Sequence, residues 1–113
     1  MKRVVIWPQA AREALRAFHW YEQEREGLGG EFLREVDGVL ELTRGRPSAG
    51  RPIGSRTRRA LLRRFPYLVL YVVEPDRLVI TGILHTHMHP RRWADRVQER
   101  LGGVGWGLGQ EVA

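Results

Sequence analysis

The sequence predicts an α+β fold: a small, twisted, antiparallel-rich sheet of four strands with a hairpin of two helices packed on one face. The chain has 113 residues, which is the length of one domain. A short apolar run opens it, two amphipathic segments separated by glycines follow, and three apolar-rich runs come after them. One strand, two helices and three strands in this order pack most simply as a layer of helices on a sheet.

The first half of the chain carries the signals for one strand and two helices. Residues 4–7, Val-Val-Ile-Trp, are β-branched and aromatic, which is typical of a strand. Pro8 suits the first turn of a helix, and apolar residues then recur at steps of three and four, so we expect a helix over residues 8–26. The run Gly27–Gly30 ends this helix. A second amphipathic helix follows and is closed by Gly45.

The second half carries the signals for strands. Residues 45–57 contain Gly, Ser and Pro without an apolar period and are expected to form a surface loop. Three apolar-rich runs separated by tight turns are then expected as antiparallel strands: Arg58–Phe65, Leu68–Val73 and Leu78–Leu84. The last two runs are almost wholly apolar, so we expect them to be central strands that are buried on both faces.

The C-terminal segment differs in composition from the rest. Residues 90–101 have a helical composition with a proline at the start, so we expect a short helix there. Residues 102–113 contain five glycines in twelve residues and are expected to be a disordered tail. The folded domain is therefore predicted to span residues 1–101.

The composition excludes several classes of protein. There are no cysteines, so disulfides and thiolate metal sites are excluded, and we expect neither a metal nor a cofactor. No apolar run is long enough for a signal peptide or a membrane span. We therefore expect a cytoplasmic protein without a membrane partner.

The positive charge is concentrated in the middle of the chain. The net charge is +6, and residues 42–73 hold eight arginines and no acidic residue. Such a block favours an anionic partner, either phosphates or carboxylates. Alternatively, the arginines protect an edge strand from aggregation. In a strand, Arg58 and Arg64 share one face, and Arg59 and Arg63 share the other. The predicted anion- or partner-binding residues are Arg58, Arg59, Arg63, Arg64, Arg91 and Arg92.

Three histidines alternate near the end of the last strand. In a strand, His85, His87 and His89 would all point to one face. Imidazoles titrate near neutral pH, so they could serve in acid–base catalysis. The alternatives are a structural role, which we favour, and a metal site, for which a fourth ligand is lacking.

Two aromatic residues are candidates for contacts with a partner. Trp20 and Tyr21 adjoin on the first helix, so one of them must point away from its apolar face. Tyr67 lies in a predicted turn and is expected to be partly exposed. We therefore consider Trp20 and Tyr67 as docking residues.

The order of these motifs resembles the RelE/ParE superfamily of toxins from type II toxin–antitoxin modules. The resemblance spans about residues 3–96. It rests on Trp7 with Ala10–Leu15, Leu28-Gly29 with Phe32 and Glu35, Arg63–Tyr67 leading into Leu70–Glu74, and Ile83–His85 running to His89–Trp93. The resemblance implies the same fold that the periodicities predict.

The superfamily implies two activities on one scaffold. RelE-like members cut mRNA in the ribosome with basic residues on the central strands and a C-terminal aromatic residue, whereas ParE-like members inhibit DNA gyrase. RelE-like toxins usually have an arginine just past the tyrosine of the Phe-Pro-Tyr motif, where this chain has Leu68. A second arginine position corresponds to His87, and the C-terminal tyrosine position to Trp93. These departures favour the ParE side.

The resemblance therefore implies a ParE-like toxin of a plasmid-stabilisation module, with DNA gyrase and a cognate antitoxin as partners in a hetero-oligomer. It implies no catalysis by the toxin itself. The first alternative is a RelE-like mRNA endonuclease with the ribosome and mRNA as partners, which would use Arg64 with His85 or His87. The second alternative is a degenerate toxin that only binds an antitoxin.

Overall fold

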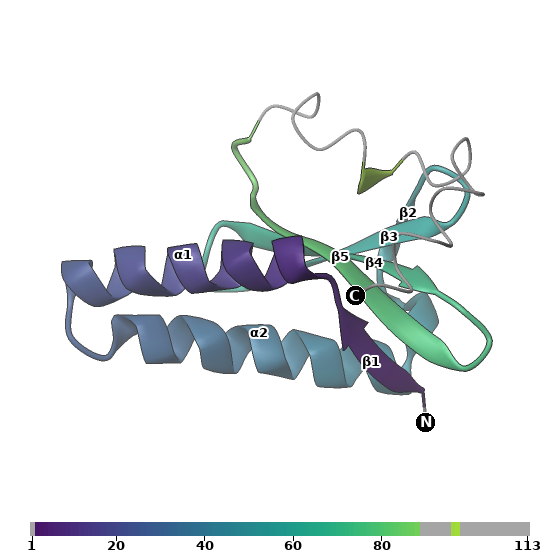
Figure 1. Cartoon of the computed structure of the whole chain (residues 1–113), viewed down its shortest axis with the longest axis horizontal. Helices are drawn as coiled ribbons and strands as arrows, with labels where there is room; N and C mark the ends of the chain where they lie inside the picture. The colour runs from purple at the N-terminus through teal and green to yellow at the C-terminus, as the bar shows by residue number, and fades with distance from the viewer. Residues whose placement is uncertain (1, 89–95, 98–113) are drawn as a thin grey trace.

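The chain folds into two long helices packed on a sheet, as seen in a computed structural model that describes residues 2–88 and 96–97 (Figure 1). In chain order the elements are β1 (Arg3–Ile6), α1 (Pro8–Glu24), α2 (Leu28–Gly45), the short 3-10 helix η1 (Pro47–Ala49), β2 (Arg51–Ile53), β3 (Thr57–Leu61), β4 (Tyr67–Val73) and β5 (Arg77–His85). The expected α+β class with a helical hairpin is therefore confirmed.

Within the described residues, the sheet has five strands, so the prediction of four is wrong. The strand order is β1-β5-β4-β3-β2, with β1 parallel to β5 and all other neighbours antiparallel. The additional strand, β2, lies in the segment 45–57 that the sequence predicts to be a loop. It is only three residues long, contains Pro52 and lies at the edge of the sheet, so it leaves no periodic apolar pattern.

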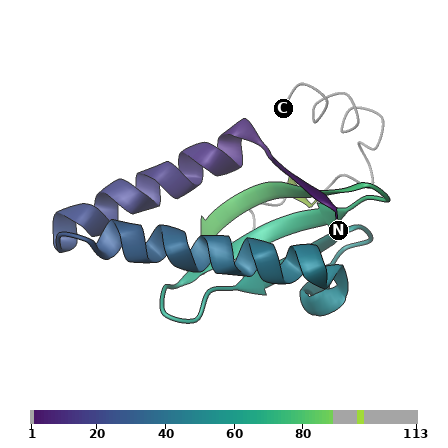
Figure 2. The same ribbon diagram turned by 90° about the horizontal axis from the view of Figure 1, so that it is seen from below.

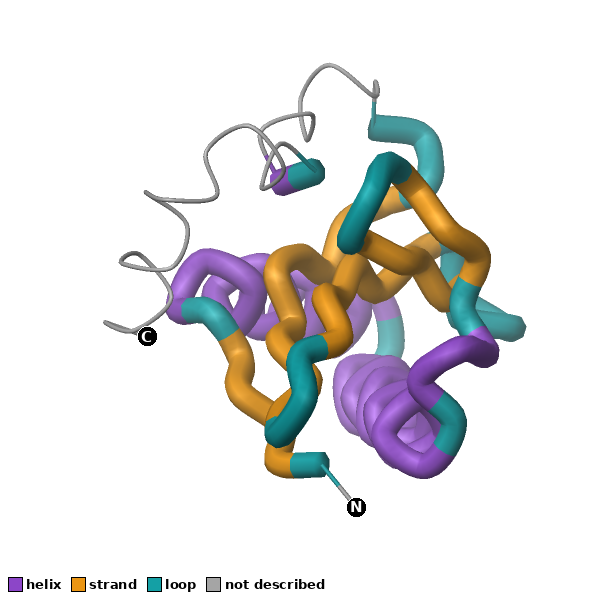
Figure 3. The backbone as a smooth tube through the Cα atoms, turned by 90° about the vertical axis from the view of Figure 1, so that its right-hand side faces the viewer, coloured by secondary structure: helices purple, strands orange, loops and turns teal. Residues whose placement is uncertain are grey.

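Both helices lie against the same layer of strands. Figure 2 shows α2 lying across the strands with α1 beside it, and Figure 3 looks along both helices and shows the twist of the sheet. Strands β4 and β5 are buried on both faces along residues 68–72 and 78–84, as the sequence predicts. On the helical side, the rings of Tyr21, Phe32 and Phe65 pack at centroid distances of 4.8–5.4 Å.

The glycines between the helices act differently from the prediction. Only Gly27, with φ 88°, turns the chain, whereas Gly29 and Gly30 lie in the first turn of α2. A Cβ at Gly29 would lie 2.6 Å from the carbonyl oxygen of Phe18, so glycine permits the close approach of the two helices. The carboxylate of Glu22 accepts the backbone N–H groups of Gly27 and Gly29 at 2.8 and 2.9 Å. The side chain of α1 thereby satisfies backbone donors at the start of α2.

The connection between β3 and β4 also differs from the prediction. The strand predicted over 58–65 ends at Leu61, and Tyr67, which was expected in the turn, is the first residue of β4. The backbone N–H of Leu62 donates to the carbonyl oxygen of Tyr67 at 2.9 Å and closes the turn. Residues 63–66 therefore form an irregular connection between the two strands.

The predicted C-terminal elements lie largely outside the described residues. Of the helix expected over 90–101 the structure describes Arg96 and Val97, both buried, and the tail expected over 102–113 is not among the described residues. None of the helices in the described part of the chain is long and apolar enough to cross a membrane.

Candidate functional site

Strand β5 has an open edge along its second half. Its first half pairs with β1, from Arg3 opposite Arg77 to Ile6 opposite Ile80. The backbone N–H of Trp7 makes the last bond of this ladder, to the carbonyl oxygen of Ile80 at 3.0 Å. The chain then turns into α1, so residues 81–85 of β5 have no neighbouring strand on that side among the described residues.

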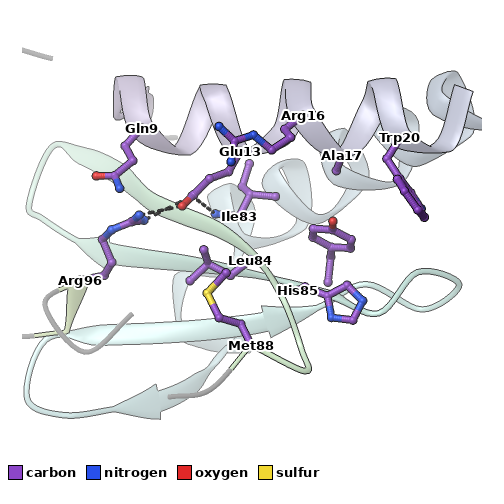
Figure 4. A pocket seen from close by; sticks show the side chains of 11 residues that line it. Gln9, Glu13, Arg16, Ala17, Trp20, Ile83, Leu84, His85, Met88 and Arg96 are labelled. Carbon is purple, nitrogen blue, oxygen red and sulfur yellow. Dashed lines mark hydrogen bonds and ion pairs between the residues drawn. The ribbon is translucent and has the colours of Figure 1, made fainter. Parts of the chain in front are cut away.

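Two charged side chains take up the backbone groups of this open edge. Glu13 on α1 accepts the backbone N–H of Ile83 at 3.1 Å, and Arg96 donates to the carbonyl oxygen of Thr81 at 2.8 Å. Glu13 and Arg96 also pair with each other through two bonds, at 2.7 and 3.3 Å (Figure 4). A Cβ at Gly82 would lie 2.9 Å from the guanidinium of Arg96. A carboxylate and a guanidinium thus replace the bonds of a missing strand.

A groove of about 440 Å³ runs between α1 and this edge, and we call it the α1–β5 groove. Its walls are formed by Gln9, Glu13, Arg16, Ala17, Trp20, Tyr67, Ile83, Leu84, His85, Met88 and Arg96. Burial raises the pKa of the Tyr67 hydroxyl, with a smaller contribution from Tyr21, so Tyr67 is a neutral hydrogen-bonding group here. The groove therefore combines apolar surface with hydrogen-bonding groups, as binding sites do.

Trp20 is the most exposed aromatic side chain of the groove. Its neighbour Tyr21 packs into the core, with ring centroids 5.4 Å from Phe32 and 4.8 Å from Phe65. Trp20 is 60% exposed and projects from α1 on the side where His85 lies (Figure 4). The expectation that one of the two adjoining aromatic residues points away from the core is confirmed, while the docking role of Trp20 and Tyr67 stays a prediction.

The histidines do not form the single row that the sequence predicts. Strand β5 ends at His85, and His87 lies in the following turn, so the argument from strand alternation is wrong; His89 lies outside the described residues. The backbone N–H of His87 donates to Nδ1 of His85 at 3.0 Å, and the two rings are 5.1 Å apart. The neutral form of His85 therefore carries its proton on Nε2. Among residues 2–88 and 96–97, no cluster of three or more His, Cys, Asp or Glu side chains could hold a metal ion.

The predicted arrangement of the arginines is also wrong. Because β3 ends at Leu61, Arg63 and Arg64 lie in the turn and do not share strand faces with Arg58 and Arg59. Arg58 donates to two backbone carbonyl oxygens, one of them that of Gly50 at 2.6 Å. Its side chain thus holds the segment that leads into β2. Arg91 and Arg92 lie outside the described residues.

The turn that carries Arg63 and Arg64 is bound to α2. The carboxylate of Glu35 accepts the backbone N–H groups of both arginines, that of Arg64 at 3.0 Å. The guanidinium of Arg64 pairs with Glu31 at 2.7 Å. Hydrogen bonds from Arg64 and Arg25 hold the pKa of Glu31 below its usual range. Arg64 therefore contacts the helical hairpin, whereas the contacts of His85 are with Tyr67 and the turn after β5.

Sequence reasoning did not identify Glu13, Arg96 or Arg51. Glu13 and Arg96 are 83 positions apart and belong to no local motif, so only the fold brings them together. Arg51 lies directly opposite Arg59 in the β2–β3 pair. The absence of acidic residues from 42–73 was the one signal that pointed to this region.

The chain is similar in sequence to a family of toxins and in fold to a solved chain of a toxin–antitoxin system. A sequence model of the family described as ParE toxin of type II toxin–antitoxin system, parDE, matches residues 4–90. A solved chain of the chromosomal ParDE toxin–antitoxin system from P. aeruginosa has a TM-score of 0.60 and 19% sequence identity, over 77% of this chain and 98% of that chain. No curated protein matches in sequence. The structural likeness supports the fold, and the sequence match spans most of the chain. This protein therefore belongs to the ParE toxin family of type II toxin–antitoxin systems.

Proposed function

We propose that the protein is a ParE-type toxin that stops DNA gyrase by binding it, and that a cognate antitoxin keeps it inactive in a hetero-oligomer. Membership of the ParE family supports the toxin role. The structural neighbour belongs to a ParDE toxin–antitoxin system, which supports an antitoxin partner. The choice of gyrase as the target rests on the resemblance to ParE-like members.

The observation that most supports action by binding, and not by RNA cleavage, is the burial of Leu68. It is 3% exposed and packs with Leu70 and Leu84 on the side of the sheet away from the hairpin. RelE-like toxins usually have an arginine at the corresponding position. A leucine cannot donate a hydrogen bond to a phosphate, and its burial leaves no polar group of its own at that point of β4.

The remaining residues of an RNA-cleaving site are held in separate contacts. Arg64 pairs with Glu31, and Nδ1 of His85 accepts a backbone N–H. The short distance between His85 and His87 is nevertheless the one observation that favours the second candidate function, a ribosome-dependent mRNA endonuclease. In that function the two imidazoles would exchange protons with the 2′-hydroxyl and the leaving oxygen.

The α1–β5 groove is the surface we assign to the antitoxin. It presents the exposed ring of Trp20 beside the open edge of β5. Aromatic side chains at the centre of an interface contribute much of its binding energy. An extended antitoxin segment could pair with residues 81–85 of β5 only by displacing Glu13 and Arg96 from the backbone groups they now occupy.

The function is tested with purified gyrase, relaxed plasmid, ATP and the toxin freed of antitoxin. We expect supercoiling to stop and linear DNA to accumulate, and we expect the same result for His85→Ala and His87→Ala. Unaffected gyrase together with mRNA cleavage in a purified translation system, lost in His87→Ala, would instead establish the endonuclease. If neither target is affected and the antitoxin still binds, the protein is a degenerate toxin.

The antitoxin surface is tested by comparing two substitutions on α1. Trp20 and Leu15 are both exposed apolar residues, 60% and 54%, but only Trp20 lines the groove. We expect Trp20→Ala to weaken antitoxin binding about thirtyfold or more, as for a central aromatic residue. Leu15→Ala should leave the affinity within about twofold, since it removes a side chain outside the groove. Equal effects of the two substitutions would contradict the assignment.

A further inference from the structure

A second groove lies at the other end of the sheet, between α2 and β3. Strand β2 pairs with β3 only from Arg51 opposite Arg59 to Ile53 opposite Thr57. Residues 60–61 at the end of β3 therefore have no strand on their outer side among the described residues. The groove has a volume of about 310 Å³, and we call it the α2–β3 groove. Its walls are formed by Leu42, Thr43, Ala49, Arg51, Arg59, Ala60 and Leu61.

Two exposed leucines line this groove. Leu42 on α2 is 56% exposed, and Leu61 on β3 is 54% exposed. Single exposed apolar side chains are common on protein surfaces. Here, however, two of them come from elements that are separate in the sequence and line the same hollow. Such a convergence of apolar surface is a mark of a binding site.

The groove also holds two arginines that face each other. Arg51 and Arg59 are directly opposite in the antiparallel pair, and like charges in this position destabilise a sheet. A nearby arginine of the same segment, Arg56, pairs with Glu74 at 3.6 Å, and neither residue lines the groove. In the described part of the chain, no carboxylate lies within ion-pair distance of Arg51 or Arg59, and residues 42–73 contain no acidic residue. A carboxylate placed between the two guanidinium groups would relieve their repulsion.

We propose that the α2–β3 groove is a second protein-binding surface, which takes an acidic segment of a partner protein. Carboxylates of that segment pair with Arg51 and Arg59, and its apolar side chains cover Leu42 and Leu61. A nucleic-acid backbone would satisfy the arginines but not the leucines, so the combination favours a protein. The proposal goes beyond the gyrase and antitoxin assignments, because no residue of this groove lines the α1–β5 groove.

The separation of the two grooves has a consequence for assembly. They lie at different strands of the sheet, β5 and β3, with β4 between them. A partner segment in one groove therefore leaves the other accessible. The toxin is thus able to hold an antitoxin on α1 and β5 while a second acidic segment occupies α2 and β3.

The proposal is tested with a fluorescently labelled peptide of repeating Glu-Glu-Leu-Leu as the probe, by anisotropy and by amide chemical shifts of the isotope-labelled protein. Control probes replace leucine by serine, replace glutamate by lysine, or use single-stranded DNA. We expect the first peptide alone to bind tightly and to shift the amides of residues 42, 51 and 59–61. Arg51→Ala with Arg59→Ala should weaken binding at least about tenfold, because charge-assisted bonds are lost. The matched control, Arg12→Ala with Arg46→Ala, removes the same charge from exposed positions outside the groove and should leave the affinity within about twofold.

A second variant separates loss of binding from loss of folding. Arg51→Glu places opposite charges across the β2–β3 pair, so it should raise the melting temperature while it abolishes peptide binding. Three results would overturn the proposal: equal peptide affinity of Arg51→Glu and the unaltered protein, tighter binding of DNA than of the peptide, or amide shifts confined to the α1–β5 groove.

Discussion

The two grooves of this toxin treat charge in opposite ways. In the α1–β5 groove, the charged side chains at the open strand edge are paired with each other. Glu13 and Arg96 form an ion pair and also bind the backbone groups of β5. In the α2–β3 groove, Arg51 and Arg59 face each other without a carboxylate within ion-pair distance among the described residues. One strand edge is closed by its own side chains, and the other is left with unbalanced charge.

Because of this difference, the two grooves require different properties of a partner. A segment that enters the α1–β5 groove at the edge of β5 must compete with bonds that already exist, so its affinity depends on what it contributes beyond them. A segment that enters the α2–β3 groove gains from charges that repel each other in the free protein. Substitution of the charged residues at the strand edge should therefore act mainly on stability in the first groove and mainly on binding in the second.

The largest effect is expected from Glu13→Ala. The substitution leaves the guanidinium of Arg96, whose side chain is 7% exposed, without its carboxylate, and removes the acceptor of the Ile83 N–H. Breaking a buried ion pair by removing one partner costs about 3 kcal/mol. Urea unfolding should show this loss, whereas Glu24→Gln, at an exposed position of α1, should change stability by less than about 0.5 kcal/mol. An unchanged midpoint for Glu13→Ala would show that the edge is not held closed by this pair.

A smaller effect is expected from Tyr71→Phe, which acts near the opposite edge of the sheet, next to β2. The buried hydroxyl of Tyr71 donates to the carbonyl oxygen of Pro47 and accepts the N–H of Gly50, both at 2.8 Å. Its loss leaves buried groups unpaired just before β2, at about 1–2 kcal/mol. We expect faster amide exchange in residues 50–53 and unchanged exchange in β5. Uniform changes across both regions would mean that the two edges are not independent.

Arg51→Glu should have a still smaller effect on stability, and of the opposite sign. The substitution places a carboxylate, in place of a second guanidinium, directly opposite Arg59. This change from like to opposite charges should stabilise the protein by about 0.5 kcal/mol. Added salt should reduce this gain, since the pair is at the surface. A destabilised variant in thermal unfolding would contradict the view that the arginines repel each other.

The smallest effect is expected at Glu31, where the charge is exposed but balanced. Arg64 and Arg25 hold its pKa below the usual range, so the stabilisation is complete above the ordinary pKa of glutamate and is lost as the pH falls through the lowered pKa. Arg64→Ala should return the pKa of Glu31 toward its ordinary value in a titration followed by NMR. The stability difference between Arg64→Ala and the unaltered protein should shrink on acidification. A pKa of Glu31 that does not move would exclude Arg64 as the main cause.

The sequence predicts those parts of the molecule that local composition determines. The apolar runs of β4 and β5 predict directly that both strands are buried. The helical period likewise predicts that Trp20 and Tyr21 cannot both face the core. By contrast, β2 is too short to leave a pattern, and the parallel pairing of β1 with β5 depends on contacts more than 70 residues apart.

The candidate sites were less predictable because they depend on where strands end. The predictions that Arg64 shares a strand face with Arg58 and that His87 shares one with His85 are wrong. The reason is that β3 ends at Leu61 and β5 ends at His85. Strand alternation loses its meaning past such an end. The Glu13–Arg96 pair and the Arg51–Arg59 pair are tertiary features that no motif encodes.

The central claim, that the toxin acts on gyrase by binding and not by chemistry of its own, is tested most directly by titration. The toxin, freed of antitoxin, is added to supercoiling reactions at several gyrase concentrations. The account predicts that the amount of toxin needed for complete inhibition rises in proportion to the amount of gyrase, and that His87→Ala follows the same line. Full inhibition by a small, fixed amount of toxin at every gyrase concentration, or no inhibition at all, would contradict it.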